Sequence, residues 1–104
     1  MKNDYSGLLR ILVDKALSGH PEDIDFIMQY LNSDAKFSTT RYVDFALSLV
    51  ENNECIARIE NYLFYGSQIQ RNYACLFLNR IGEWLPVKKA FELGLIDEIQ
   101  AYSR

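Results

Sequence analysis

The chain has 104 residues, a formal net charge of −3, and 49% hydrophobic and 24% charged residues. This composition is typical of one compact globular domain, and its acidic balance argues against a nucleic-acid partner, because phosphate binding depends on Lys and Arg. One His and two Cys exclude most metal sites and a disulfide framework.

Helical periodicity runs through nearly the whole chain, and no stretch shows the strict alternation of a strand between turn signals. The sequence therefore predicts an all-α fold with almost no strand. Glycines, prolines and capping residues divide the periodic stretches into separate helices. In chain order these helices are expected over about residues 4–18, 21–33, 39–51, 53–66, 67–82, 86–94 and 96–102.

Local chemistry marks several of the helix starts. Asn3 or Asp4 can cap the first helix, and Pro21 suits the first turn of the second, where a missing N–H costs nothing. Ser67 and Gln70 form an S-x-x-Q capping box, in which each side chain bonds the other residue's backbone. The fifth helix therefore has the best-defined start.

The N-terminal region and the cysteines bear on the compartment. The apolar stretch from Leu8 to Leu17 is interrupted by three charged residues, so it is neither a signal-peptide core nor a membrane span of ~20 apolar residues. Cys55 and Cys75 lie 20 positions apart inside periodic segments and are expected to be reduced, small apolar residues. We therefore predict a cytoplasmic protein without a membrane segment.

The predicted helices follow an internal repeat in the sequence. Arg10, Arg41 and Arg71 open similar runs, 31 and 30 residues apart, and each run leads through a break into a second helix. One such hairpin cannot cover its own apolar face, whereas three stacked hairpins bury a continuous core. We predict a single repeat domain of three stacked helical hairpins plus a short C-terminal helix, with units at about residues 4–33, 38–66 and 67–102.

The last unit resembles an armadillo or HEAT repeat. The stretch 71–82 carries a small residue and spaced leucines, and a glycine and a pair of aliphatic residues follow within 90–99. The resemblance covers mainly residues 67–102, with weaker echoes earlier in the chain. It implies a right-handed α-α superhelix that binds other proteins.

The fifth helix combines a polar stripe with a wide apolar arc. Gln68, Arg71, Asn72, Cys75 and Asn79 fall within about 100° of one another around the helix axis. In armadillo repeats an asparagine two residues after the leucine grips peptide backbone, whereas Asn79 follows its leucine directly, so its role is not carried over in full. The polar stripe, with Arg10 and Arg41 at equivalent positions, is the expected partner-binding surface.

The wide apolar arc of the same helix needs a cover. We expect the final short helix to provide it through Ile99 and Tyr102, because terminal repeats require capping. The alternative is that another molecule covers part of this arc.

No catalytic constellation can be found in the sequence. His20 is expected to cap the second helix rather than to join a triad, because no base oriented by a third group accompanies it. Glu22, Asp23 and Asp25 fall in the first helical turn, where acids offset the dipole, and they lack the spacing of a calcium loop. We expect no catalytic residues, no metal and no cofactor, and hence no enzyme.

The sequence favours a small protein–protein interaction module, an adaptor or scaffold that binds another protein through its superhelical face. The alternative is an immunity or antitoxin-type inhibitor that masks a basic toxic enzyme through its own negative charge. A homodimer through an exposed end of the stack also stays open, because three repeats leave two ends to cover.

Overall fold

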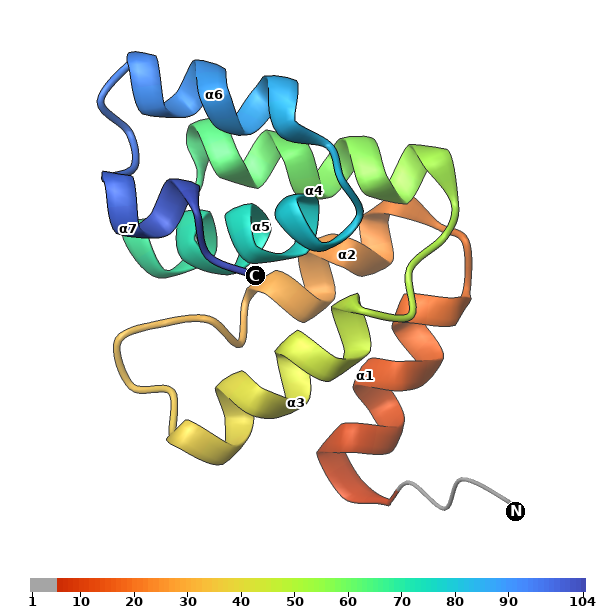
Figure 1. Cartoon of the computed structure of the whole chain (residues 1–104). Coiled ribbons are helices and arrows are strands. Elements are labelled where there is room, and N and C mark those ends of the chain that lie inside the picture. The colour runs from red at the N-terminus through yellow and green to blue at the C-terminus, as the bar shows by residue number, and fades with distance from the viewer. Residues whose placement is uncertain (1–5) are drawn as a thin grey trace. The chain divides into compact units, whose positions relative to one another are not determined.

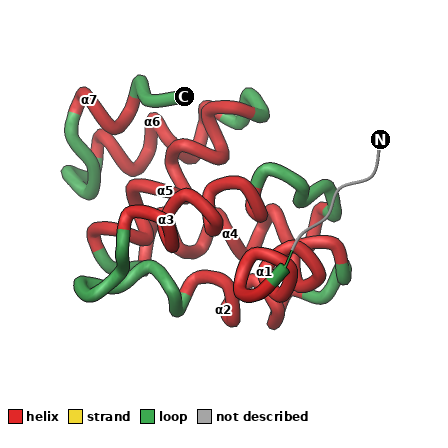
Figure 2. Tube along the Cα trace, turned by 90° about the horizontal axis from the view of Figure 1, so that it is seen from below, coloured by secondary structure: helices red, strands yellow, loops and turns green. Residues whose placement is uncertain are grey.

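The computed structural model describes residues 6–104, and over this range every regular element is a helix (Figures 1 and 2). The all-α prediction is therefore confirmed. In chain order the helices are α1 (Gly7–Leu17), α2 (Pro21–Met28), α3 (Phe37–Leu47), α4 (Asn53–Tyr65), α5 (Gln68–Arg80), α6 (Trp84–Glu92) and α7 (Glu98–Ala101).

The helices group into two compact units, with the boundary inside α4 between Ile56 and Ala57. In the first unit α1 packs against both α2 and α3. Apolar side chains at helical spacing form its core, because residues three and four apart lie on one helix face. These buried residues are Leu12, Val13, Ala16, Ile24, Ile27, Met28, Leu31, Val43, Ala46, Leu47, Val50 and Cys55.

The turn from α1 to α2 is built on Gly19, whose positive φ of 80° allows the left-handed stop that the sequence predicts. The Ser18 hydroxyl donates to the Lys15 carbonyl at 2.9 Å and accepts from the His20 backbone N–H at 3.1 Å. The neighbouring Ser18 hydroxyl and the positive charge of Lys15, 3.5 Å away, lower the pKa of the Asp23 carboxyl. His20 occupies the N-cap position, yet its side chain makes no capping bond, so the capping role expected for it is wrong. The side-chain hydrogen bonds of this turn are instead made by Ser18.

Several helices end earlier than the periodicity predicts. After α2 and after α3 the chain continues in tight turns with bonds between residues three apart, such as Leu31 N–H to Met28 carbonyl at 3.0 Å and Val50 N–H to Leu47 carbonyl at 3.0 Å. Such tightening is common at helix ends and keeps the apolar face aligned. Leu31 and Val50 are therefore buried although they lie outside the helices.

Four helix starts also differ from the expectation, and two of them, α3 at Phe37 and α7 at Glu98, lie two residues before and two residues after the predicted positions. α6 begins at Trp84, two residues before Pro86, because proline is tolerated wherever the N–H has no helical partner, as in the first turn. α1 begins at Gly7, with Ser6 as an N-cap that makes no side-chain bond. The capping residues expected for it, Asn3 and Asp4, lie outside the described residues.

In the second unit α5 packs against α6 and α7, and α6 packs against α7. The capping box of α5 is confirmed: the Gln70 N–H donates to Ser67 Oγ at 3.3 Å, and the Ser67 N–H donates to Gln70 Oε1 at 2.9 Å. The buried apolar side chains of this unit are Ile59, Leu63, Ala74, Cys75, Phe77, Leu78, Val87, Ala90 and Ile96.

The capping box yields a first prediction. Ser67→Ala removes the acceptor for the Gln70 N–H and should cost about 1 kcal/mol of stability. For a chain of this size that loss lowers the melting temperature by roughly 4–8 °C. Thermal unfolding followed by circular dichroism measures the shift. Ser33→Ala, in an exposed turn, is the matched control and should leave the melting temperature unchanged; equal shifts in both variants would show that the box does not stabilise α5.

Candidate binding site

The polar stripe of α5 lies under the chain's own C-terminal segment, residues 97–104. Asn79 is only 6% exposed, and its Nδ2 donates to the carbonyls of Ala101 at 2.9 Å and Ser103 at 2.6 Å. The Cys75 thiol donates to the Gln100 carbonyl at 3.0 Å. Asn79 therefore does not lie on the open partner-facing surface that the sequence predicts.

The pattern of these bonds follows from the end of α7. The last four carbonyl groups of a helix have no partner inside that helix. α7 has only four residues, and donors for its last carbonyls come from outside it. Cys75 and Asn79 lie one turn apart on α5 and donate to three carbonyls at this end, those of Gln100, Ala101 and Ser103. A side-chain bond from Gln100 Nε2 to Asn72 Oδ1 adds a contact one turn earlier. The polar stripe thus caps α7 from outside.

The start of α7 is closed by a second capping box. The Gln100 N–H donates to Asp97 Oδ1, and the Asp97 N–H donates to Gln100 Oε1, both at 2.8 Å. The D-x-x-Q pattern at Asp97 and Gln100 is a signal for this box in the sequence, as S-x-x-Q is at Ser67 and Gln70. Both ends of this short helix are therefore held by side-chain hydrogen bonds.

Apolar anchoring of the C-terminal segment is weak. Ile99 and Tyr102, expected to cover the apolar arc of α5, are 82% and 78% exposed. That expectation is wrong, because the segment turns its polar backbone toward α5 and its apolar side chains outward. Ile96 is the buried apolar residue that precedes the segment.

The other predicted site residues have separate surroundings. Arg10 is exposed and pairs with Asp14 at 3.3 Å, and the Arg41 guanidinium lies 5.5 Å from the Phe37 ring centroid. Arg71 donates to the Phe64 carbonyl at 3.3 Å, while its buried Nε has no partner in the structure. Gln68 donates to Asn72 within α5 at 3.0 Å. The structure therefore joins Gln68 to Asn72, and it joins Asn72 and Asn79 separately to the C-terminal segment. Each arginine makes a local contact of its own.

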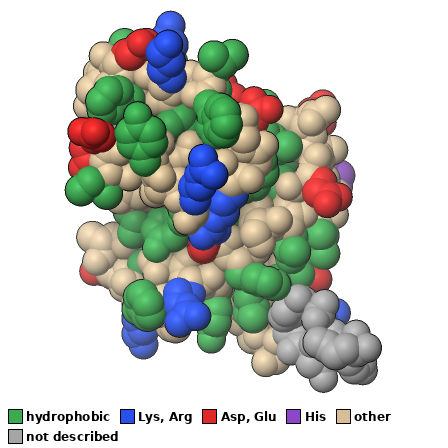
Figure 3. All heavy atoms as spheres, in the orientation of Figure 1, with side chains coloured by type: hydrophobic (Ala, Val, Ile, Leu, Met, Phe, Trp, Pro, Cys, Tyr) green, Lys and Arg blue, Asp and Glu red, His purple; other side chains and the backbone are tan. Residues whose placement is uncertain are grey.

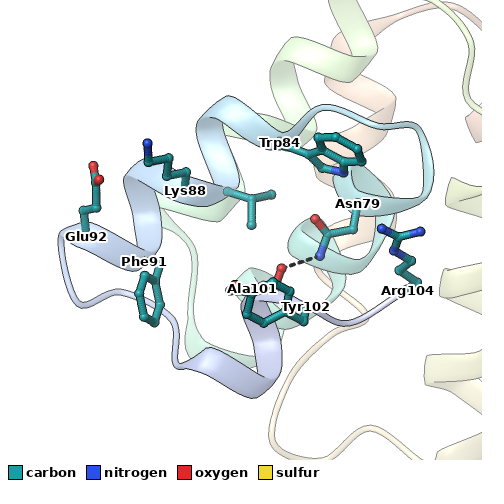
Figure 4. Close-up of a pocket in the computed structure, with 9 residues that line it drawn as sticks. Asn79, Trp84, Lys88, Phe91, Glu92, Ala101, Tyr102 and Arg104 are labelled. Carbon is teal, nitrogen blue, oxygen red and sulfur yellow. Dashed lines mark hydrogen bonds between the residues drawn. The ribbon is translucent and has the colours of Figure 1, made fainter.

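A pocket with a volume of about 560 Å³ opens between α6, the end of α5 and the C-terminal segment (Figure 4). One wall comes from α6 and the opposite wall from the C-terminal segment, with Asn79 between them. In Figure 4 the charged ends of Lys88 and Glu92 point outward, and the Asn79 side chain reaches the pocket from α5. The lining residues are Asn79, Trp84, Val87, Lys88, Phe91, Glu92, Ala101, Tyr102 and Arg104.

Exposed apolar side chains gather around this pocket. We name this surface the α6–α7 face, and hydrophobic side chains on it are visible at the upper left of Figure 3. Its residues are separated in sequence by a turn, so periodicity within one helix does not reveal that they share a surface. Its exposed apolar members that line the pocket are Trp84, Phe91 and Tyr102, and α6 and α7 with the turn between them also expose Leu85, Leu93 and Ile99.

Comparisons of the chain with protein-family models, with curated proteins and with solved structures found no match. None of the helices formed by residues 6–104 has both the length and the apolar character of a bilayer span. In the same part of the chain, no group of three or more His, Cys, Asp or Glu side chains is placed to hold a metal ion.

The docking of the C-terminal segment can be tested through Cys75. Asn79→Ala removes two hydrogen bonds worth about 1 kcal/mol each, so the segment should open roughly 30 times more often. Alkylation of Cys75 by iodoacetamide, read separately from Cys55 by mass spectrometry, should accelerate by the same factor. Gln68→Ala, which leaves every bond to the segment intact, is the control. An unchanged Cys75 rate in Asn79→Ala would mean that Asn79 does not hold the segment.

Burial of the Cys75 thiol makes the stability of the folded chain depend on pH in the alkaline range. It raises the pKa of the Cys75 thiol to about 11, from a usual value of about 9. Between these values the unfolded chain loses the proton while the folded chain keeps it, so this contribution to stability falls as pH rises from about 9 to about 11. Cys75→Ser keeps a donor for the Gln100 carbonyl without titrating in this range.

Urea unfolding of the parent chain and Cys75→Ser, compared across this range, isolates the thiol from the tyrosines and lysines that both chains share. The parent should lose stability relative to the variant above pH about 9. A difference that does not change with pH would contradict the buried, protonated thiol.

Proposed function

We propose that the chain is a protein–protein interaction module whose partner binds the α6–α7 face. The observation that carries the proposal is that three exposed aromatic side chains, Trp84, Phe91 and Tyr102, line one pocket, with further exposed aliphatic side chains on the same two helices and the turn between them. Soluble proteins rarely expose contiguous large apolar surface unless something binds there. Trp and Tyr are also the residues that most often dominate binding energy at protein interfaces.

The proposal moves the binding surface away from the polar stripe on which the sequence prediction was based. Three members of the stripe, Asn72, Cys75 and Asn79, are hydrogen-bonded to the C-terminal segment, so a partner would have to displace that segment before pairing with the same groups. The α6–α7 face needs no such displacement. In this proposal the module has no catalytic role and works in the cytoplasm, and its three hairpins stack as the resemblance to armadillo and HEAT repeats implies.

The inhibitor alternative depends on charge. An inhibitor that masks a basic enzyme needs an acidic surface. The pocket rim instead carries charges of both signs, from Lys88, Glu92 and Arg104. Apolar recognition is therefore the better-supported basis for binding at this face. The two alternatives differ in salt dependence, since salt weakens attraction between exposed charges and leaves apolar contacts intact.

A matched pair of variants tests this proposal. Leu85, 81% exposed on α6, and Leu17, 62% exposed on α1, are both replaced by Glu in an N-terminally tagged chain. Leu85→Glu should reduce capture of the partner from a host lysate by about tenfold or more, because a charge enters an apolar interface. Leu17→Glu should leave capture unchanged, and neither variant should alter the melting temperature.

Three outcomes would count against the proposal. Equal capture by Leu85→Glu and the parent would show that the α6–α7 face is not the binding surface. Loss of capture at high salt would favour the charge-driven inhibitor. A dimer of the parent on size exclusion that Leu85→Glu dissociates would identify a second copy of the chain as the occupant of this face.

A further inference from the structure

The pocket on the α6–α7 face contains one buried polar group whose hydrogen-bonding capacity is only half used. Asn79 is 94% buried, and every hydrogen bond that its side chain makes within residues 6–104 comes from Nδ2. The amide is oriented this way because two of the three groups that face Nδ2, at 2.9 and 2.6 Å, are carbonyls, which only accept. In Figure 4 the oxygen of the same amide is turned into the pocket.

An amide oxygen accepts up to two hydrogen bonds, and one left unpaired in an apolar setting destabilises whatever covers it. Solvent can pair with this oxygen while the pocket is open. An occupant that excludes solvent must bring a donor of its own to the same point. The pocket therefore selects for an N–H or O–H at the tip of its occupant.

The walls of the pocket favour an occupant that carries an aromatic ring. Trp84 and Phe91 from α6 and Tyr102 from the C-terminal segment surround a space of about 560 Å³, within the range of ligand pockets. Aromatic rings prefer to meet other rings in stacked or edge-to-face pairs, which add to the energy of burial. A small hydroxyl side chain would leave these walls uncovered.

The charges at the rim select against a cation. Lys88 and Arg104 are two of the three charged residues that line the pocket, and Glu92 is the third. An ammonium or guanidinium group would supply donors, but it would also meet this positive balance. A neutral donor meets no such opposition.

We propose that the pocket receives the side chain of a tyrosine or tryptophan from the partner protein, with its O–H or N–H donating to Asn79 Oδ1. Phenylalanine fills the same space but leaves the oxygen unpaired, so the site discriminates between aromatic side chains. That the ring comes from a partner protein rests on the proposed function. The recognition of the ring itself is tested without a partner.

The experiment compares p-cresol, the side chain of tyrosine, with toluene, the side chain of phenylalanine. Trp84 is the only tryptophan of the chain and lines the pocket, so its fluorescence reports occupancy directly. We expect p-cresol to bind about tenfold more tightly than toluene, the difference that one satisfied buried acceptor makes. Equal affinities, or tighter binding of toluene, would overturn the proposal.

A pair of tyrosine variants locates the binding. Tyr102, which lines the pocket, and Tyr65, on α4, are 78% and 85% exposed, so neither replacement by Ala removes a core side chain. Tyr102→Ala should weaken p-cresol binding about fivefold or more by removing a wall, and Tyr65→Ala should leave it unchanged. Equal effects in both variants would mean that p-cresol binds elsewhere and would also overturn the proposal.

The two proposals fail separately. If p-cresol is preferred but Leu85→Glu still captures the partner, the pocket recognises the ring as inferred and the partner face is wrong. If Leu85→Glu loses the partner but p-cresol shows no preference, the face is correct and its anchor residue is not a tyrosine or tryptophan.

Discussion

The last carbonyl groups of a helix have no hydrogen-bond partner within it, and at the end of α7 the Ala101 carbonyl, like that of Ser103 just beyond, is paired with a donor from α5. Donors from α5 meet this need: the thiol of Cys75 and the amide of Asn79 reach the carbonyls of Gln100, Ala101 and Ser103. Without them, the C-terminal segment would keep only the bond from Gln100 to Asn72 and the preceding buried side chain of Ile96. One wall of the pocket and part of the exposed apolar face would then be lost. The arrangement of the second unit therefore depends on a small set of polar contacts rather than on apolar packing alone.

The helices themselves could be predicted from the sequence because their signals are local. Periodicity identified each helix, and the box at Ser67 and Gln70 identified one start by chemistry that spans only four residues. Boundaries were less predictable where a helix passes into tighter turns that keep the same buried face, as after Met28 and Leu47. There the apolar pattern continues although the helix has ended.

The polar stripe could also be found from sequence, but not what lies over it. Spacing places Asn72, Cys75 and Asn79 on one side of α5, whereas the groups they meet are 22 to 28 residues further along the chain. A local pattern cannot tell whether a polar stripe faces solvent, a partner or a distant part of its own chain. The pocket could not be predicted from local patterns for the same reason, because Trp84 and Tyr102 approach each other only through the packing of α6 against α7.

The segment at the end of the chain is held by its main chain and exposes its side chains. Cys75 and Asn79 bond to carbonyl oxygens, which every amino acid possesses, while the side chains of Ile99 and Tyr102 are exposed. Substitutions at positions 99 and 102 can therefore change the outer surface without disturbing the contacts that fix it. Stability and specificity are carried by different atoms of the same few residues. Related chains could diverge in what they recognise while keeping one scaffold, and a library randomised at these two positions would be a natural starting point for engineered binders.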